Sequence, residues 1–329
     1  MSRSLSQRSA ANVRPVAVMQ SRRSVKVSAA SIEELHTKFG IEGSVQVVAG
    51  RGGLPSVVLK HNNGSSAEVV LFGGVVSSWK QPSGDEVLYV RPDAVFDKSK
   101  PISGGIPHCF PQFGPGAMQQ HGFARNLDWA IASTSADPNP DDKDPMVEIT
   151  LTENEYTTKM WPFKFKVVYS VSLHGESLRT DLRVINTDDK PFDFSAALHS
   201  YIEVLSVQQA SVLGLKGLTY LDKSKDASNP TSMTESRDAV TFTGPTDSVY
   251  LNSPEQVQLD VGTGAAVALE STGWSDTVVW SPWTAMPACY ERFVCVENAQ
   301  VKPTTVAPGE SWRATSNFTV IDTVAAPSS

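Results

Sequence analysis

The sequence predicts an all-β protein built as a large antiparallel β-sandwich. From about residue 40, short runs of alternating apolar and polar residues are separated by clusters of glycine, asparagine and serine, which is typical of strands joined by turns. Helical periodicity is scarce, and strands do not alternate with helices as they would in a parallel sheet. With 40% hydrophobic and 19% charged residues, the composition is that of a soluble globular protein.

The elements can be followed in order along the chain. The first is a predicted helix, SIEELHTKFG, which ends at Gly40 as a C-cap would. The predicted strands of the first half are SVQVV, SVVLKHNNGSSAEVVLF, EVLYV, the alternating positions Val147, Ile149 and Leu151, and Phe163, Phe165 and Val167 leading into VVYSVSLHGESLRTDLRVIN. Those of the second half are VQLDVGTGAAVALES, DTVVWS, RFVCVEN and WRATSNFTVI.

This patterning predicts one domain over residues 40–322. Two polar connections, 136–145 and 222–238, interrupt it, but strand patterning resumes on both sides without a change in composition. No internal repeat is evident, and residues 323–329 are expected to be a disordered tail. We expect the protein to act as a monomer.

The first 32 residues differ from the rest of the chain. They contain no Asp or Glu, many serines and six basic residues, and such a segment is typical of an organelle transit peptide. A chloroplast is the expected destination and a mitochondrion the alternative; a merely disordered tail is the other interpretation. Removing six positive charges takes the remaining chain from −7 to −13, which argues against a nucleic-acid partner.

The sequence also disfavours a membrane protein and a disulfide-stabilised protein. No apolar run approaches the ~20 residues of a membrane-spanning helix, so no membrane association is expected. The three cysteines, Cys109, Cys289 and Cys295, do not form a disulfide framework, which favours a reducing compartment.

The composition of the segment 103–126 predicts an irregular loop. It holds five glycines and three prolines in 24 positions, together with apolar residues that should keep it partly buried. His108, Cys109 and His121 do not predict a metal site, because adjacent side chains point to opposite faces and no second close pair completes four ligands. The chain also lacks the GxxxxGK[ST] nucleotide loop and the GxSxG nucleophile elbow. No cofactor is expected.

Two strands carry candidate catalytic groups. In FDFSAALHSYIEV, an extended backbone would place His199 on a polar face opposite Phe194 and Leu198; this face either meets a ligand or faces solvent. In RFVCVENAQ, Glu297 shares its face with two apolar residues, so it is either a desolvated carboxylate with a raised pKa or a residue emerging into solvent. Tryptophans such as Trp280 suit sugar rings, although core packing is their commoner role.

Taken together, these stretches resemble the hexose-6-phosphate mutarotase (glucose-6-phosphate 1-epimerase) branch of the aldose 1-epimerase family. The matching blocks, in the family's order, are GGIPHCFPQFGPG…QQHGFARN, ALHSYIEV, TDSVYLN, TVVWSPW and CVENA. The likeness spans about residues 43–320. It implies a sandwich of the galactose-mutarotase type and an interconversion of α and β anomers of an aldose phosphate without a cofactor.

The resemblance also implies roles for individual residues. His199 would be the acid on the ring oxygen and Glu297 the base on the anomeric hydroxyl, since a charged imidazole and an ionised carboxylate can coexist near neutral pH. The residues implied to bind substrate are His121 and Asp247 for sugar hydroxyls, Arg125 for the phosphate, and Gln112 and Trp280 as pocket lining. The stiff loop would then fix His121 and Arg125 accurately against a small substrate.

One position departs from the family pattern. Phosphate-specific members usually have an arginine before GGIP, where this chain has Ser103, and the missing guanidinium would remove a bidentate phosphate contact. Arg91, Lys98 or Lys100 could compensate. The alternatives are therefore a mutarotase for unphosphorylated aldoses and a non-catalytic carbohydrate-binding sandwich.

Overall fold

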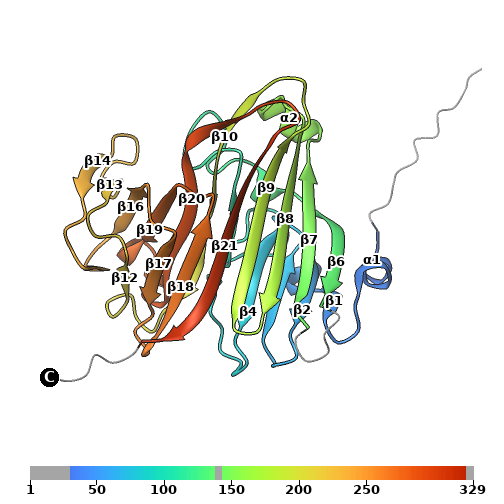
Figure 1. Ribbon diagram of the computed structural model, residues 1–329, viewed down its shortest axis with the longest axis horizontal. Helices are drawn as coiled ribbons and strands as arrows, with labels where there is room; N and C mark the ends of the chain where they lie inside the picture. Colours follow the sequence, from blue (N-terminus) through green and yellow to red (C-terminus); the bar gives the residue numbers. More distant parts are fainter. Residues whose placement is uncertain (1–29, 138–142, 324–329) are drawn as a thin grey trace, which may run out of the picture. The chain divides into compact units, whose positions relative to one another are not determined.

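The computed structural model describes residues 30–137 and 143–323, and nearly all of their regular structure is β-strand (Figure 1). The helices are α1 (Ile32–Phe39) and α2 (Glu155–Met160), with short 3-10 turns at η1 (Arg51–Gly53), η2 (Ala124–Asn126), η3 (Trp283–Ala285) and η4 (Tyr290–Arg292). The predicted transit peptide up to residue 29 and the predicted tail from residue 324 lie outside the described residues. From Ile32 onward the described chain belongs to one compact unit, and Ile32 and Leu35 of α1 pack on its core.

The described strands form three sheets, and all pairings between named strands are antiparallel, so the predicted fold class is confirmed. The first sheet is β1 (Val45–Ala49), β2 (Pro55–Lys60), β3 (Ser66–Val70) and β4 (Val75–Lys80). The second, in spatial order, is β14 (Thr231–Thr234), β13 (Thr219–Asp222), β16 (Thr246–Leu251), β19 (Asp276–Ser281), β20 (Phe293–Val306), β10 (Phe192–Leu198) and β5 (His108–Cys109), with β11 (Tyr201–Glu203) also paired to β20. The third is β15 (Ala239–Thr241), β12 (Ser211–Leu213), β17 (Gln256–Asp260), β18 (Ala265–Thr272), β21 (Ser311–Asp322), β9 (Ser177–Asn186), β8 (Phe165–His174), β7 (Pro145–Thr152) and β6 (Ala130–Ala136).

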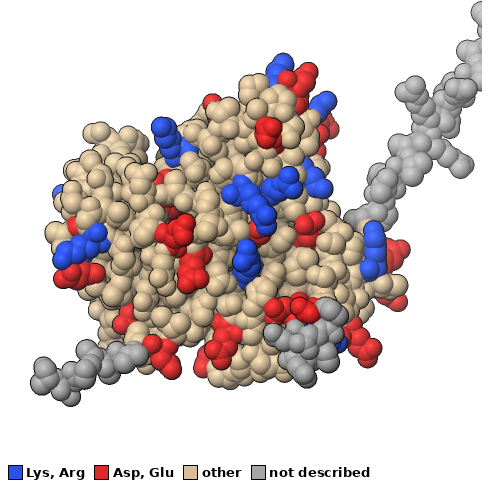
Figure 2. Space-filling model, in the orientation of Figure 1, with Lys and Arg blue, Asp and Glu red and all other residues tan. Residues whose placement is uncertain are grey.

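The third sheet shows how strand alternation builds the core. Along β8 every second residue is buried, from Phe165 to Leu173, and these side chains join the main hydrophobic cluster. The opposite face is polar, and Figure 2 shows Lys and Arg side chains gathered over β8, β9 and β21. One apolar and one charged face is the expected pattern for a sheet packed on one side only.

The second sheet brings together segments that are distant in sequence. In its register, Leu198 at the end of β10 lies opposite Asn298 on β20, and Val278 on β19 lies opposite Glu297. On the next pair, Asp247 of β16 lies opposite Trp280 of β19. The sheet therefore brings residues from four separate blocks of sequence to neighbouring positions.

Candidate active site

A cavity of about 440 Å³ opens where the second sheet meets the loop 103–126. It is lined by most of the residues singled out from sequence, namely His121, Arg125, His199, Asp247, Trp280 and Glu297. We call this cavity the His199–Glu297 pocket. Its size suits a monosaccharide or a small phosphorylated sugar better than a large cofactor.

His199 and Glu297 face each other inside this pocket. The backbone leaves the regular ladder after β10, where the His199 N–H donates to Pro107 O at 2.9 Å, and resumes it at Tyr201. His199 Nδ1 lies 3.4 Å from Glu297 Oε1, with side-chain exposures of 12% and 2%. Neither His199 Nδ1 nor Glu297 Oε2 has a hydrogen-bond partner within the described chain. Two buried polar atoms are thus left for a ligand to satisfy.

Burial governs the ionisation of this pair. It lowers the pKa of His199 well below its usual value, and the nearby His121 and Arg125 act in the same direction. It raises the pKa of Glu297 well above its usual value, with Asp247 adding to the effect. The pocket therefore disfavours both the imidazolium and the carboxylate, which differs from the charged pair expected from the sequence.

Aromatic rings hold the His199 imidazole in place. Tyr201 stacks on it with ring centroids 4.9 Å apart and planes 14° apart, and Trp280 meets its edge at 5.7 Å. His121 approaches at 5.7 Å from another side. Because three rings pack around the imidazole, its orientation is fixed before any substrate arrives.

His121 is oriented by the loop that carries it. Its backbone has a positive φ of 66°, and its Nδ1 accepts a hydrogen bond from the Gly114 N–H at 3.2 Å. Nε2 therefore holds the proton of the neutral ring. Burial lowers the pKa of His121 to about 3, with Arg125 and Lys223 contributing, so the ring is a neutral donor near pH 7.

The structure places Gln112 in the loop rather than among the pocket-lining residues. Its side-chain amide donates to Gly114 O at 3.0 Å, and its Oε1 accepts from the Met118 N–H at 3.0 Å. His108, in the same segment, is buried in the core, where it stacks on Trp129 at 4.7 Å and its pKa is lowered to about 4 by burial. Across residues 30–137 and 143–323, no group of three or more His, Cys, Asp or Glu side chains is arranged to hold a metal ion.

Two cationic residues of the pocket carried no strong sequence signal. Lys223, in the polar connection after β13, places its Nζ 5.3 Å over the Phe113 ring. Arg91 also lines the pocket, whereas Lys98, another candidate to replace the missing guanidinium, pairs with Asp128 at 2.7 Å outside it. The placement of Lys223 could not be read from sequence, because a lysine in a polar loop is usually solvated.

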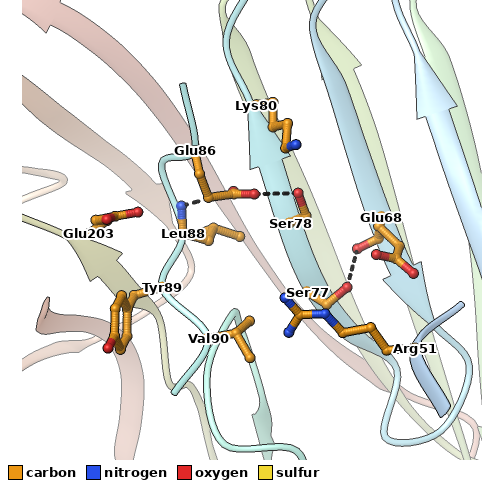
Figure 3. A pocket seen from close by; sticks show the side chains of 10 residues that line it. All are labelled: Arg51, Glu68, Ser77, Ser78, Lys80, Glu86, Leu88, Tyr89, Val90 and Glu203. Carbon is orange, nitrogen blue, oxygen red and sulfur yellow. Dashed lines mark hydrogen bonds between the residues drawn. The ribbon is translucent and has the colours of Figure 1, made fainter. Parts of the chain in front are cut away.

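A second cavity, of about 350 Å³, lies beside β4 and has different chemistry (Figure 3). Its central carboxylate, Glu86, accepts hydrogen bonds from Ser78 Oγ at 2.5 Å and from the Trp79 N–H at 2.7 Å. None of its described lining residues is a histidine. Since the Glu86 carboxylate is already satisfied by hydrogen bonds within the protein, it is poorly placed to act as a base on a ligand.

Comparison with known proteins agrees with this geometry. Residues 55–319 match the aldose 1-epimerase family. A relative from Cenchrus ciliaris named "Putative glucose-6-phosphate 1-epimerase" is 38% identical over 286 residues, 82% of this chain and 85% of that protein. The crystal structure of a "putative mutarotase" from Salmonella typhimurium superposes with a TM-score of 0.72 at 28% identity, covering 82% of this chain and 91% of that one. A galactose mutarotase-like protein from Clostridium acetobutylicum, 17% identical, shares the fold with a TM-score of 0.69 and coverage of 85% and 98%.

The antiparallel β-sandwich is the fold of the galactose mutarotase-like structures. The chain belongs to the aldose 1-epimerase family of isomerases, whose substrates are sugars, and the family prediction from sequence is confirmed. No helix within the described ranges is long and apolar enough to span a membrane.

Proposed function

We propose that the protein interconverts the α and β anomers of an aldohexose 6-phosphate, most specifically glucose 6-phosphate. The observation that carries the proposal is the close approach of His199 Nδ1 and Glu297 Oε1, 3.4 Å apart, in a pocket that also holds three cationic side chains. The first feature supplies the acid and base of mutarotation, and the second suits a phosphorylated sugar. The name of the Cenchrus ciliaris relative points to the same substrate.

In the proposed mechanism the His199–Glu297 pair holds one proton, which lies on His199 when the sugar is bound, so that the reaction begins from the imidazolium and the carboxylate. Glu297 takes the proton from the anomeric hydroxyl O1, the C1–O5 bond breaks to give the open aldehyde, and His199 gives its proton to O5. The aldehyde turns about its C1–C2 bond, and the two transfers reverse to close the ring on the other face. Burial strengthens both groups in these roles, because a carboxylate with a raised pKa is a stronger base and an imidazolium with a lowered pKa is a stronger acid.

The remaining pocket residues would bind and orient the sugar. The neutral His121 can donate from Nε2 to a hydroxyl, and Asp247 can accept from one. Burial raises the pKa of Asp247, while Lys223 opposes this and favours the carboxylate. Trp280 offers a ring at the wall of the pocket.

The test is to follow freshly dissolved α-glucose 6-phosphate by NMR or polarimetry with catalytic amounts of protein. We expect equilibration of the anomers to become faster in proportion to the protein concentration. Binding without acceleration would support a carbohydrate-binding sandwich instead. Equal acceleration of glucose and glucose 6-phosphate would support a mutarotase for unphosphorylated aldoses.

Arg125 provides a second test of substrate class. Its Nη2 donates to Gln120 O at 2.9 Å, and its Nε is buried without a partner in the described chain. Arg125→Ala should weaken binding of glucose 6-phosphate by about 1.5–3 kcal/mol, as expected for a charge-assisted contact, and that of glucose far less. Calorimetric titration with both sugars measures this. Equal losses would show that Arg125 only shapes the loop.

A further inference from the structure

Three cationic side chains line the His199–Glu297 pocket in a protein whose net charge is −7. They are Arg91, Arg125 and Lys223. Arg125 is committed in part to the Gln120 carbonyl, and Lys223 lies over the Phe113 ring. Of the three, only Arg91 forms an ion pair with a carboxylate among the described residues, and its partner is Asp93.

Arg91 and Ser103 are cross-strand neighbours. Val90 and Gly104 form an antiparallel bridge, and the Arg91 N–H donates to Ser103 O at 3.1 Å. Side chains at directly opposed positions of an antiparallel pair emerge on the same face about 5 Å apart. Both residues line the pocket, so the short Ser103 side chain leaves open the space beside the Arg91 guanidinium.

The guanidinium of Arg91 is paired with Asp93. Nε donates to Asp93 Oδ1 at 2.9 Å and Nη2 to Oδ2 at 2.6 Å, a two-pronged contact. Exposure is unequal, because the Arg91 side chain is 17% exposed and that of Asp93 is 57% exposed. An ion pair with so exposed a carboxylate is screened by water and adds little stability.

We propose that Arg91 acts with Arg125 to make the pocket selective for phosphorylated sugars, and that the Arg91 guanidinium exchanges Asp93 for the substrate phosphate. This inference rests on the function proposed above. A phosphate presents the same paired oxygens to the guanidinium fork as Asp93 does, but carries more charge and lies in a less screened site. Asp93 acts as a resident competitor that holds Arg91 in position while the pocket is empty.

Two substitutions with opposite expected effects test the exchange. Arg91→Met should raise the KM for glucose 6-phosphate by about 10- to 100-fold, the effect of losing a charge-assisted contact, and leave kcat and the KM for glucose nearly unchanged. Asp93→Asn removes the competitor, so it should lower the KM for glucose 6-phosphate by about 2- to 5-fold, the range of an exposed ion pair. In the Arg91→Met background, Asp93→Asn should have no effect.

Lys98→Met is the matched control, because it also removes one cation and breaks an ion pair with an exposed aspartate, here Asp128, outside the pocket. It should leave both KM values unchanged. Arg91→Lys, which keeps the charge and loses the fork, should fall between wild type and Arg91→Met. An equal rise in KM for both sugars in Arg91→Met, or no gain in Asp93→Asn, would overturn the inference.

Failure of the proposed function would look different. If wild-type protein accelerates anomer exchange of neither sugar, the enzymatic proposal fails, and calorimetric titration with glucose 6-phosphate still tests Arg91. In that case the exchange requires that Asp93→Asn tighten and Arg91→Met weaken the measured binding. Unchanged binding in both variants would refute the exchange.

Discussion

Glu297→Gln and His199→Asn should each lower kcat for anomer exchange by about 10²- to 10⁴-fold, the usual contribution of one general acid or base. Glutamine keeps the shape of the side chain but cannot accept the O1 proton. Asparagine in place of the imidazole cannot deliver a proton to O5. The two groups face each other at 3.4 Å, so each substitution removes one half of a single proton-transfer device.

The double substitution separates this account from a general loss of structure. Because paired groups act as a unit, the two losses should not multiply, and the double variant should resemble the slower single variant. Anomer exchange measured by NMR at saturating sugar gives kcat for all three. Sugar binding should survive, since neither change removes His121, Asp247 or Arg125.

The control is the folded state of each variant, measured by thermal unfolding and by titration with sugar. Glu297 is 2% exposed and already disfavours its charged form, so the neutral glutamine should not destabilise the protein. A folded single variant with near wild-type turnover would show that the acid or the base lies elsewhere in the pocket.

Much of the fold can be predicted from local sequence, because apolar and polar residues alternate within each strand segment. Strand β8 is an example, because buried and partly exposed residues alternate along its whole length. The predicted helix is also present as α1, which ends at Phe39 just before Gly40. Helix α2 was missed because it is six residues long; its signal was the capping pair Asn154 and Thr157, whose side chains each accept from the other's backbone N–H.

The site was less accessible to sequence reasoning, because it depends on long-range pairing. A pattern can show that Glu297 shares a face with Cys295, but not that β20 lies against β19 and next to His199. Gln112 was expected to line the pocket, but its side chain forms hydrogen bonds to the backbone of its own loop. The local sequence does not distinguish these two roles of a glutamine. The geometry of a loop is set by backbone contacts that produce no repeating pattern in the sequence.

Gly122→Ala should damage both stability and activity, because this glycine is where the loop closes on itself. Its φ is +68°, and an added Cβ would lie 2.2 Å from Phe110 O. The substitution therefore combines an unfavourable backbone region with a clash against rigid backbone. We expect the free energy of unfolding to fall by about 1–2 kcal/mol from the first effect and by about 1–3 kcal/mol more from the second.

Gly43→Ala provides the matched control, because Gly43 has a similar φ of +76° but nothing within 4 Å of its added Cβ. It should show the backbone cost alone, with unchanged turnover. In Gly122→Ala the loop must shift, and His121 beside it moves with the backbone; a displacement of about 1 Å at a binding group can cost ~10²-fold in rate. Equal unfolding free energies for the two variants, measured by urea denaturation, would show that the loop relaxes freely. The glycines and prolines of 103–126 would then do no more than close a turn, and the accurate placement of His121 would need another cause.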